Sequence, residues 1–340
     1  MKNKTEKLTK GGKQEISDQK YEKFASGLII VKSENSNFNA DFTHTPRRLP
    51  DENGTIYATD KSLKYCMRKY LKDNSGEIVF GWRRKTNSGD PINIDENYKQ
   101  IFLVTNLGDK NNILQNLVRC IDIRLFGVTF APEEKGKNVS LTGTVQISYG
   151  INKYNENVHY SNQILSPYQP KEKGQQTTIG EESKALESHY VFDFIVNPNH
   201  LKDGVDHLNS EEKGTATLTQ NDIKLFKEAA RVGVSNVNST TKIGSENELL
   251  LYVEYDRPIM LQNLKDFITI ERDGDKKKVK LTELLRYLKT VQSAMPSNDT
   301  NPTMTIEVYY EPNKTELEGT EDSEITISKY NLITGDQIQQ

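Results

Sequence analysis

Hydrophobic and polar positions along the chain follow two periods, one typical of strands and the other of amphipathic helices. Runs of β-branched, leucine and aromatic residues predict strands at 24–32, 77–82, 123–130, 139–150, 189–197, 248–255, 266–272, 304–310 and 324–328. Apolar residues spaced three and four apart predict helices at 60–72, 111–120, 219–233 and 281–289. The two kinds of element alternate irregularly, with no internal repeat and no clear linker. This pattern favours one α+β domain that carries insertions.

Three polar segments interrupt the pattern. Residues 1–22 are rich in Lys, Glu and Gly and predict a flexible tail, which leaves 23–335 as the folded domain. Residues 33–54 form a polar loop that is long enough to suggest a function. Residues 151–186 are too long for a turn and too polar for a core, so they predict an excursion from the domain in the form of an extended hairpin.

Composition narrows the class of protein. With 340 residues, 34% hydrophobic and 27% charged, the chain is polar but has enough apolar residues to form a sizeable core. No run of about 18 apolar residues predicts a membrane span, and the first residues lack the apolar stretch of a signal peptide, so we expect a cytoplasmic protein. Two cysteines, Cys66 and Cys120, make neither a disulfide framework nor a zinc site.

Charge is segregated along the chain although the net charge is only −3, from 45 basic and 48 acidic residues. That balance excludes a uniformly basic nucleic-acid-binding protein but not a local basic surface. Residues 61–85 hold eight basic side chains against two acidic ones, whereas residues 309–324 hold six acidic side chains against one lysine. The acidic segment is interpreted as a solvated loop.

Motifs that carry enzyme chemistry are absent. The sequence has no phosphate-binding loop, no dinucleotide fingerprint, no zinc-protease motif and no nucleophile elbow. Its five histidines never lie three or four residues apart, the usual spacing of metal ligands on a helix, and His189 is expected at a strand edge. We therefore expect no catalysis, no metal and no cofactor.

The segment ATDKSLKYCMRKYLK (58–72) carries the most information about binding. One arc of this helix is apolar and predicts burial: Leu63, Cys66, Met67, Tyr70 and Leu71. The remaining face carries a stripe of cations: Lys61, Lys64, Arg68 and Lys72. Thr59 or Asp60 can cap the first turn, and Ser62 adds a hydroxyl there. Such a helix can pack on a sheet while it turns cations, a hydroxyl and free N–H groups toward a polyanion.

A solvated helix face is the ordinary explanation of such a stripe. Two observations favour nucleic acid instead. The stripe itself contains no acidic residue to form i, i+4 pairs, and further cations lie on both sides of it in the sequence. These are Arg47 and Arg48 before the helix and Arg83, Arg84 and Lys85 after it.

Several sequence blocks, in order, resemble one known family. They are SNFNAD (36–41), TDKSLKYCMRKYL (59–71), DIRLFGVTF (122–130), LTGTVQISYG (141–150), HYVFDFIVNP (189–198), and a late helix, polar S/T-x-K loop and Leu-rich strand that end at residue 256. From about residue 23 to 256 the chain is similar to the backbone subunit of type I CRISPR surveillance complexes (Cascade), the RNA-binding subunit of the RAMP superfamily, most closely its type I-B branch. The chain departs from the family where SNFNAD lacks the usual Pro and Gly and where Thr144 replaces a proline.

This resemblance implies an RRM-like (ferredoxin-like) palm with finger and thumb insertions. Copies of the chain would stack into a helical filament along crRNA, beside other Cascade subunits, and target DNA would pair with the guide; no membrane is implied. The thumb candidate is 151–186 and the finger candidate 83–100. The resemblance assigns sequence-independent RNA contacts to Asn37, Asn39, Arg47, Arg48, Lys61, Ser62, Lys64 and Arg68. Holding phosphate and ribose leaves base edges free for pairing.

Two alternatives remain open from the sequence. Type III relatives cleave target RNA with an acidic residue in the loop after the first strand, and Asp41 lies in such a loop, so a RAMP-type ribonuclease is one alternative. A monomeric RNA-binding or guide-processing protein is the other, and filament formation on guide RNA distinguishes it from a backbone subunit.

Overall fold

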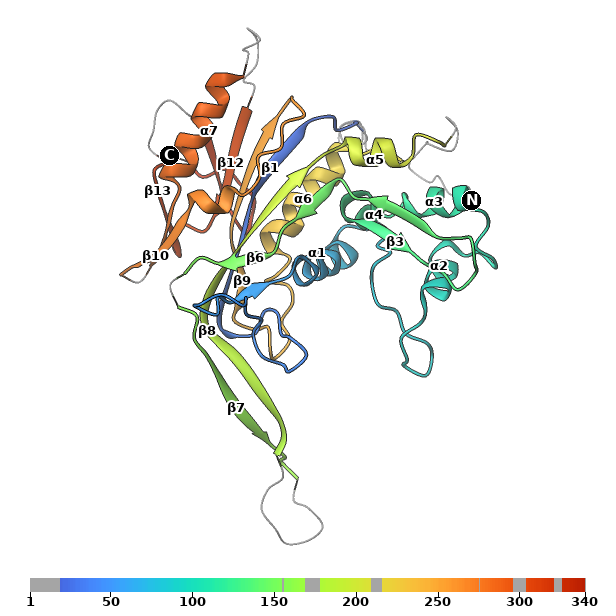
Figure 1. Cartoon of the computed structure of the whole chain (residues 1–340), viewed down its shortest axis with the longest axis horizontal. Helices are drawn as coiled ribbons and strands as arrows, with labels where there is room; N and C mark the ends of the chain where they lie inside the picture. Colours follow the sequence, from blue (N-terminus) through green and yellow to red (C-terminus); the bar gives the residue numbers. More distant parts are fainter. Residues whose placement is uncertain are drawn as a thin grey trace, which may run out of the picture.

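A nine-stranded sheet runs through the middle of the molecule (Figure 1). The computed structural model describes residues 19–154, 156–168, 178–208, 216–274, 276–295, 304–320 and 326–339. The strands of the sheet are β1 (Phe24–Ser36), β2 (Tyr57–Ala58), β5 (Val145–Ile147), β6 (Gly150–Asn152), β7 (His159–Leu165), β8 (Thr178–Val196), β9 (Ser245–Tyr255), β12 (Met304–Tyr310) and β14 (Ile327–Asn331). The main path is β14-β12-β9-β1-β8-β6-β2, and β5 and β7 also pair with β8.

The centre of this sheet has the topology of an RRM. Strands β9, β1, β8 and β6 are neighbours and antiparallel, and helices α1 (Asp60–Asn74) and α6 (Gln220–Val232) connect them along the chain. The two helices contact each other on one face of the sheet. This arrangement confirms the predicted α+β, RRM-like fold.

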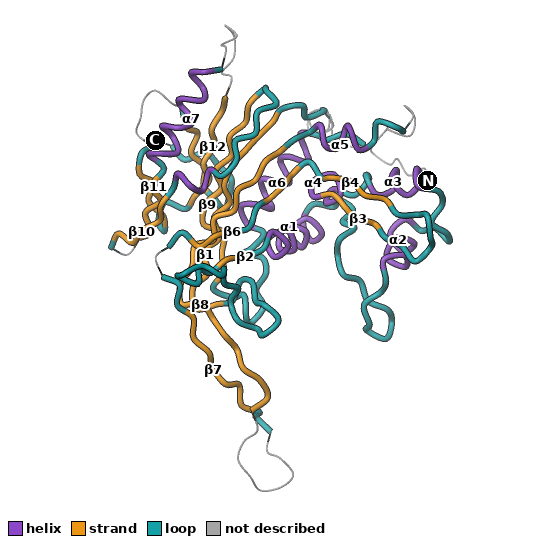
Figure 2. The backbone as a smooth tube through the Cα atoms, in the orientation of Figure 1, coloured by secondary structure: helices purple, strands orange, loops and turns teal. Residues whose placement is uncertain are grey.

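Alternating residues of β1 face two separate cores, as the pleat of a strand requires. Ile29 and Val31 pack with α1 and α6, whereas Leu28 and Ile30 pack on the opposite face. That opposite face is covered by α7 (Thr282–Ala294), the short helix η1 (Leu264–Phe267), and a small sheet of β10 (Thr269–Asp273), β11 (Lys276–Lys280) and β13 (Thr315–Glu318). Figure 2 shows helices on both sides of the strands.

A third group of elements extends the helical side of the sheet (Figure 1). It contains α2 (Ile94–Phe102), α3 (Lys110–Leu117), α4 (Ile121–Phe126), β3 (Gly127–Phe130), β4 (Val139–Thr142) and α5 (Asn199–Gly204). Asn93 and Asp109 begin α2 and α3 with reciprocal capping hydrogen bonds. The finger candidate, 83–100, consists of a loop closed by a bridge between Lys85 and Pro91, followed by most of α2.

A long hairpin projects from the sheet (Figures 1 and 2). Its strands are β7 and the first part of β8, which pair from His159 with Ala185 to Leu165 with Thr178. The rest of β8 pairs with β1, β5 and β6, so one continuous strand belongs to both the hairpin and the sheet. The thumb candidate, 151–186, contains this hairpin; its residues 155 and 169–177 lie outside the described part of the chain.

One predicted strand is absent, and another is only partly correct. Residues 77–82 form no strand, because the Asp122 carboxylate accepts the N–H groups of Phe80 and Gly81. Within 123–130 the first residues belong to helix α4, and β3 begins only at Gly127. Gly127 adopts φ 74°, a conformation that favours glycine and ends the helix.

Other predicted segments also differ from the observed elements. The predicted strand 139–150 is divided into β4, β5 and β6, and the predicted strand 324–328 corresponds to β14, which begins at Ile327. Residues 324 and 325 lie outside the described part of the chain. The predicted flexible tail was too long at its inner end, because Tyr21 is only 1% exposed. The Tyr21 hydroxyl hydrogen-bonds with the Tyr252 hydroxyl and donates to the Glu254 carboxylate on β9, so this residue belongs to the fold. Residues 1–18 of the predicted tail lie outside the described part of the chain.

Candidate nucleic-acid interface

Helix α1 is fixed at its N-terminus and along its apolar face. Of the two predicted N-cap candidates, Thr59 is the N-cap residue, and its hydroxyl accepts a hydrogen bond from the Ser62 N–H. The Ser62 hydroxyl in turn donates to the Thr59 carbonyl. Leu63, Cys66, Met67 and Leu71 are fully buried against the sheet, and Tyr70 is partly buried. The first turn of α1 is therefore held in place with its remaining face toward solvent.

The cation stripe on α1 is paired with acidic residues, and the expectation that it lacks them is wrong. Asp60 accepts from Lys61 at 2.7 Å and from Lys64 at 3.1 Å. Lys64 is 9% exposed, and burial lowers the pKa of its ammonium despite the attraction of Asp60. The Lys61 side chain is 77% exposed and extends into solvent. Of these two lysines, Lys61 is the one with charge available to a ligand.

Arg68 is also engaged within the fold. Its Nε lies 3.1 Å from the Asp122 carboxylate, and its guanidinium lies over the Phe126 ring at 5.3 Å from the ring centroid. Lys64 lies over the same ring at 5.8 Å. The pattern within the helix could not reveal Asp122, which lies 54 residues further along the chain. Lys64 and Arg68 thus attach α1 to α4. That they also contact RNA stays a prediction.

The two asparagines of the SNFNAD loop act as braces between elements. The Asn39 side-chain oxygen accepts from both the N–H and the hydroxyl of Thr59, and so links the loop to the N-cap of α1. The Asn37 side-chain amide donates to the carbonyls of His44 and Ser183, and so links the loop to the hairpin strand β8. The buried side-chain oxygen of Asn37 has no hydrogen-bond partner within the described structure.

Arg47 and Arg48 follow this loop but differ in their partners. The Arg48 guanidinium donates to the carbonyls of Gly54 and Asn157 and contacts His159 Nδ1 at 2.6 Å, which ties the loop to the base of the hairpin. The Arg47 Nε is buried and has no hydrogen-bond partner among the described residues. A buried donor without a partner is costly, so this Nε makes Arg47 a candidate for a contact that the protein alone does not supply.

Lys242 joins this site although it was not among the predicted site residues. It lies in the loop between α6 and β9, and its ammonium donates to the Phe38 carbonyl and lies over the Phe38 ring at 5.0 Å from the centroid. Burial lowers the pKa of this ammonium. The signal in the sequence was the polar S/T-x-K loop, whose backbone pairs with β1 and the SNFNAD loop at Glu34 and Asn37.

Asp41 holds a turn closed. Its carboxylate accepts hydrogen bonds from the N–H groups and the hydroxyls of Thr43 and Thr45. The hydrogen bond from the Thr43 hydroxyl is the largest cause that lowers the Asp41 pKa to about 2. Among the described residues there is no group of three or more His, Cys, Asp or Glu side chains placed to hold a metal ion. These hydrogen bonds give Asp41 a local structural role in the turn.

Comparison with known proteins places the chain in a family. The family profile described as CRISPR-associated protein Cas7 matches residues 23–290. The chain is a member of the Cas7 family. No curated protein matches it in sequence.

Solved structures share the fold of this Cas7 chain. One, described as a CRISPR RNA-guided surveillance complex, is similar with a TM-score of 0.50 and 15% identity, over 90% of this chain and 94% of the other. A second, described as a CRISPR RNA-guided surveillance complex, pre-nicking, has a TM-score of 0.55 and 15% identity, over 91% and 96%. At this level of identity the likeness supports the fold.

A buried charge network lies where the hairpin of the Cas7 chain joins the sheet. His189 is fully buried, so the expectation of an edge residue is wrong. Its Nδ1 lies 2.5 Å from Glu248 on β9, and its Nε2 lies 3.1 Å from Glu187, which also pairs with Lys277 of β11 at 2.6 Å. Burial opposes the charge on His189, but the two carboxylates outweigh it and raise its pKa to about 9. Burial likewise opposes the charge on Glu187, yet His189 and Lys277 lower its pKa to about 2.

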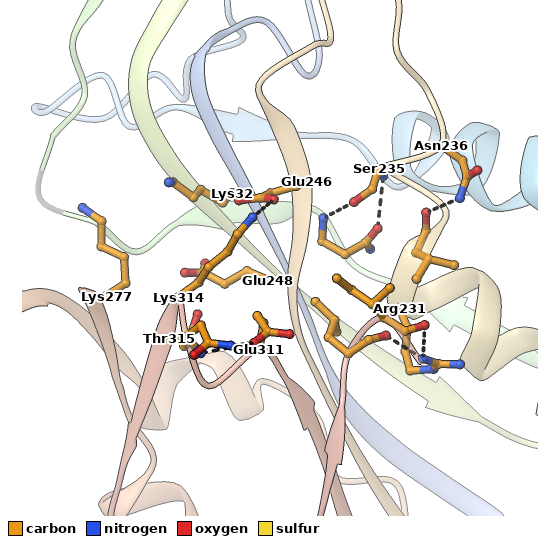
Figure 3. A pocket seen from close by; sticks show the side chains of 15 residues that line it. Lys32, Arg231, Ser235, Asn236, Glu246, Glu248, Lys277, Glu311, Lys314 and Thr315 are labelled. Atoms are coloured by element: carbon orange, nitrogen blue, oxygen red, sulfur yellow. Dashed lines mark hydrogen bonds and ion pairs between the residues drawn. The ribbon is translucent and has the colours of Figure 1, made fainter. Parts of the chain in front are cut away.

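A cavity of about 650 Å³ lies between the end of α6 and the strands near the C-terminus (Figure 3). Several of its charged side chains have partners within the protein: Lys314 binds Glu246, Glu248 binds His189, and Arg231 donates to the carbonyl of Leu332. None of the predicted RNA-binding residues lines it. Among the described residues of this Cas7 chain, no helix combines the length and apolar character needed to span a bilayer.

Proposed function

We propose that this Cas7 chain is a crRNA-binding backbone subunit of a type I CRISPR surveillance complex, similar to the type I-B branch. Copies of the chain stack along the guide with other Cascade subunits. They hold its phosphates and riboses and leave its bases free to pair with target DNA. Membership of the Cas7 family carries the general assignment, and the similarity in fold to two RNA-guided surveillance complexes supports it.

The observation that supports RNA binding by this chain is the arrangement at the first turn of α1. There, the exposed ammonium of Lys61 and the unpaired Nε of Arg47 lie on two segments that Asn39 joins through Thr59 and the Arg47 N–H. Lys61 pairs with Asp60 at 2.7 Å, but its side chain is 77% exposed, whereas that of Arg68, which pairs with Asp122, is 21% exposed. Cations of this kind bind phosphate without reading sequence, as a subunit that accepts any guide requires.

The double variant Lys61→Ala, Arg47→Ala tests this site. Each phosphate contact to a single strand contributes about 0.7 to the slope of log affinity against log salt, so loss of two contacts should flatten the slope by about 1.4. The measurement is binding of a labelled single-stranded RNA at several salt concentrations. A matched control is Arg286→Ala, Lys276→Ala, which removes two exposed cations from the opposite side of the sheet.

The pair Lys64→Ala, Arg68→Ala separates the two possible roles of the paired cations. If these residues contact RNA, the salt slope falls; if they only join α1 to α4, thermal stability falls and the slope stays as in the wild type. For the double variant Lys61→Ala, Arg47→Ala, an unchanged salt slope would mean that RNA binds to another surface of the chain.

The RNA that copurifies with the chain tests the assignment to a CRISPR surveillance complex. The chain should copurify with RNAs that share one repeat-derived sequence and differ in their spacers, and it should form filaments on such a guide. Random cellular RNA bound to a monomer would support the RNA-binding surface and contradict the backbone role. RNA cleavage that is lost in Asp41→Asn would instead establish the ribonuclease alternative.

A further inference from the structure

Two stacked pairs of aromatic rings lie beside the first two turns of α1. Tyr57 of β2 stacks on Tyr149 with ring centroids 5.5 Å apart and planes 25° apart. Tyr65 of α1 stacks on Trp82 at 5.4 Å and 23°. Tyr149 is 47% exposed and Tyr65 is 45% exposed, unlike the buried aromatic residues of the two cores. These four side chains, here called the aromatic platforms, present ring surface to solvent.

The platforms lie on either side of Lys61. Tyr65 is one helical turn beyond Lys61, so the two side chains share a face of α1. On the other side, Tyr57 precedes the Thr59 cap by two residues and carries the stacked ring of Tyr149. Aromatic surface and exposed charge therefore alternate from β2 along α1.

Cations continue this surface beyond the second platform. Lys72 lies on α1 seven residues, or two turns, after Tyr65. Its ammonium lies over the Trp82 ring at 5.3 Å from the centroid. Arg83 and Lys85, which follow Trp82, are exposed. Positive charge around exposed rings favours a polyanion with planar groups over an apolar protein surface, because a protein partner would have to desolvate these cations.

We infer that the aromatic platforms stack on unpaired bases of a single-stranded nucleic acid whose phosphates lie on Lys61 and Arg47. This inference rests on the proposed function and adds a second kind of contact to it. Stacking accepts any base, since every base has a π-face, so it is compatible with guides of any sequence. It also differs from the phosphate contacts in one measurable way, because stacking does not depend on salt as ion pairing does.

Trp82 makes the test direct, because it is the one tryptophan in the 340 residues. The probe is an adenine-rich single-stranded RNA, compared with an abasic ribose-phosphate strand of the same length and charge. Tryptophan emission of the full chain should be quenched by the RNA and not by the abasic strand. Tyr65→Leu and Tyr149→Leu should each weaken RNA binding about 5- to 150-fold, while the salt slope keeps its wild-type value.

Tyr287→Leu is the matched control, since Tyr287 also stacks on an aromatic ring, Phe267, but on the opposite side of the sheet. It should bind RNA as the wild type does, and the melting temperature of each variant reports whether it is folded. RNA binding without quenching, and with wild-type affinity in Tyr65→Leu and Tyr149→Leu, would overturn the inference and leave the proposed function intact.

Two other outcomes would show that the aromatic platforms bind something other than RNA, or that the chain binds no RNA. If Trp82 emission changes with protein concentration in the absence of RNA, the platforms are an interface between copies of the chain, and the inference is wrong. If the chain binds no RNA and copurifies with none, the proposed function itself fails, independently of the fluorescence result.

Discussion

Replacing His189 by glutamine is expected to remove a pH-dependent part of the stability of this protein. The pKa of His189 rises from an ordinary value of 6.5 to about 9 because Glu248 and Glu187 outweigh the effect of burial. At about 1.4 kcal/mol for each pKa unit, this rise corresponds to roughly 3 kcal/mol. Because the folded-state pKa is the higher one, the stabilisation is complete below pH 6.5 and is lost as pH rises through about 9.

The assay is urea unfolding of the wild type and His189→Gln, followed by circular dichroism between pH 6 and 9.5. The difference in free energy of unfolding between the two proteins should shrink by roughly 3 kcal/mol across this interval. Subtracting one free energy of unfolding from the other cancels the contributions of other groups that titrate in this pH interval. His207→Gln is the control, because the His207 side chain is 54% exposed and should give a small difference that does not vary with pH in this way. A constant difference for His189→Gln would refute the reasoning.

Three further predictions concern the interior. Arg124→Ala leaves its buried carboxylate partner, 2.6 Å away, without a counter-charge, and should lower the free energy of unfolding by about 3–5 kcal/mol in urea titration; a loss near zero would contradict this. Gly27→Ala would bring a methyl group within 2.0 Å of a carbonyl oxygen of β9 and should cost about 3 kcal/mol in thermal unfolding, whereas Gly180→Ala has open space around it and should be nearly neutral. Burial raises the pKa of the Cys66 thiol to about 11 and also that of Cys120, so the native protein should not react with a thiol reagent, and two thiols should appear on unfolding.

Local periodicity predicted the elements that form the centre of the fold. Helices α1 and α6 lie within a residue or two of the predicted segments, because apolar spacing and capping residues within each segment determine them. The segment at 77–82 has the composition of a strand, but its N–H groups bind Asp122 instead of a neighbouring strand. That choice depends on a residue about 40 positions away, which a local pattern cannot reveal.

The sequence predicted that the loop 33–54 and α1 share a surface, but not how their side chains are paired. The loop 33–54 and α1 do lie together, joined by Asn39 and Thr59. The sequence did not predict that the cations of the stripe have acidic partners. Asp60 was considered only as a cap, and Asp122 comes from another helix. The stacked rings at Tyr65 and Trp82 come from segments separated by a loop, and no sequence period links them.

The continuous strand β8 restricts how the projecting hairpin can change length during evolution. At about 3.3 Å per residue, its 19 residues span roughly 60 Å, from the hairpin to the far end of the sheet. Inserting one residue where β8 leaves the sheet would exchange the two faces of every position on one side of the insertion. If the sheet side of β8 shifted, His189 would face away from Glu248 and Phe192 would leave the core. Insertions and deletions in relatives of this chain should therefore collect at the tip of the hairpin, or occur in pairs along its strands.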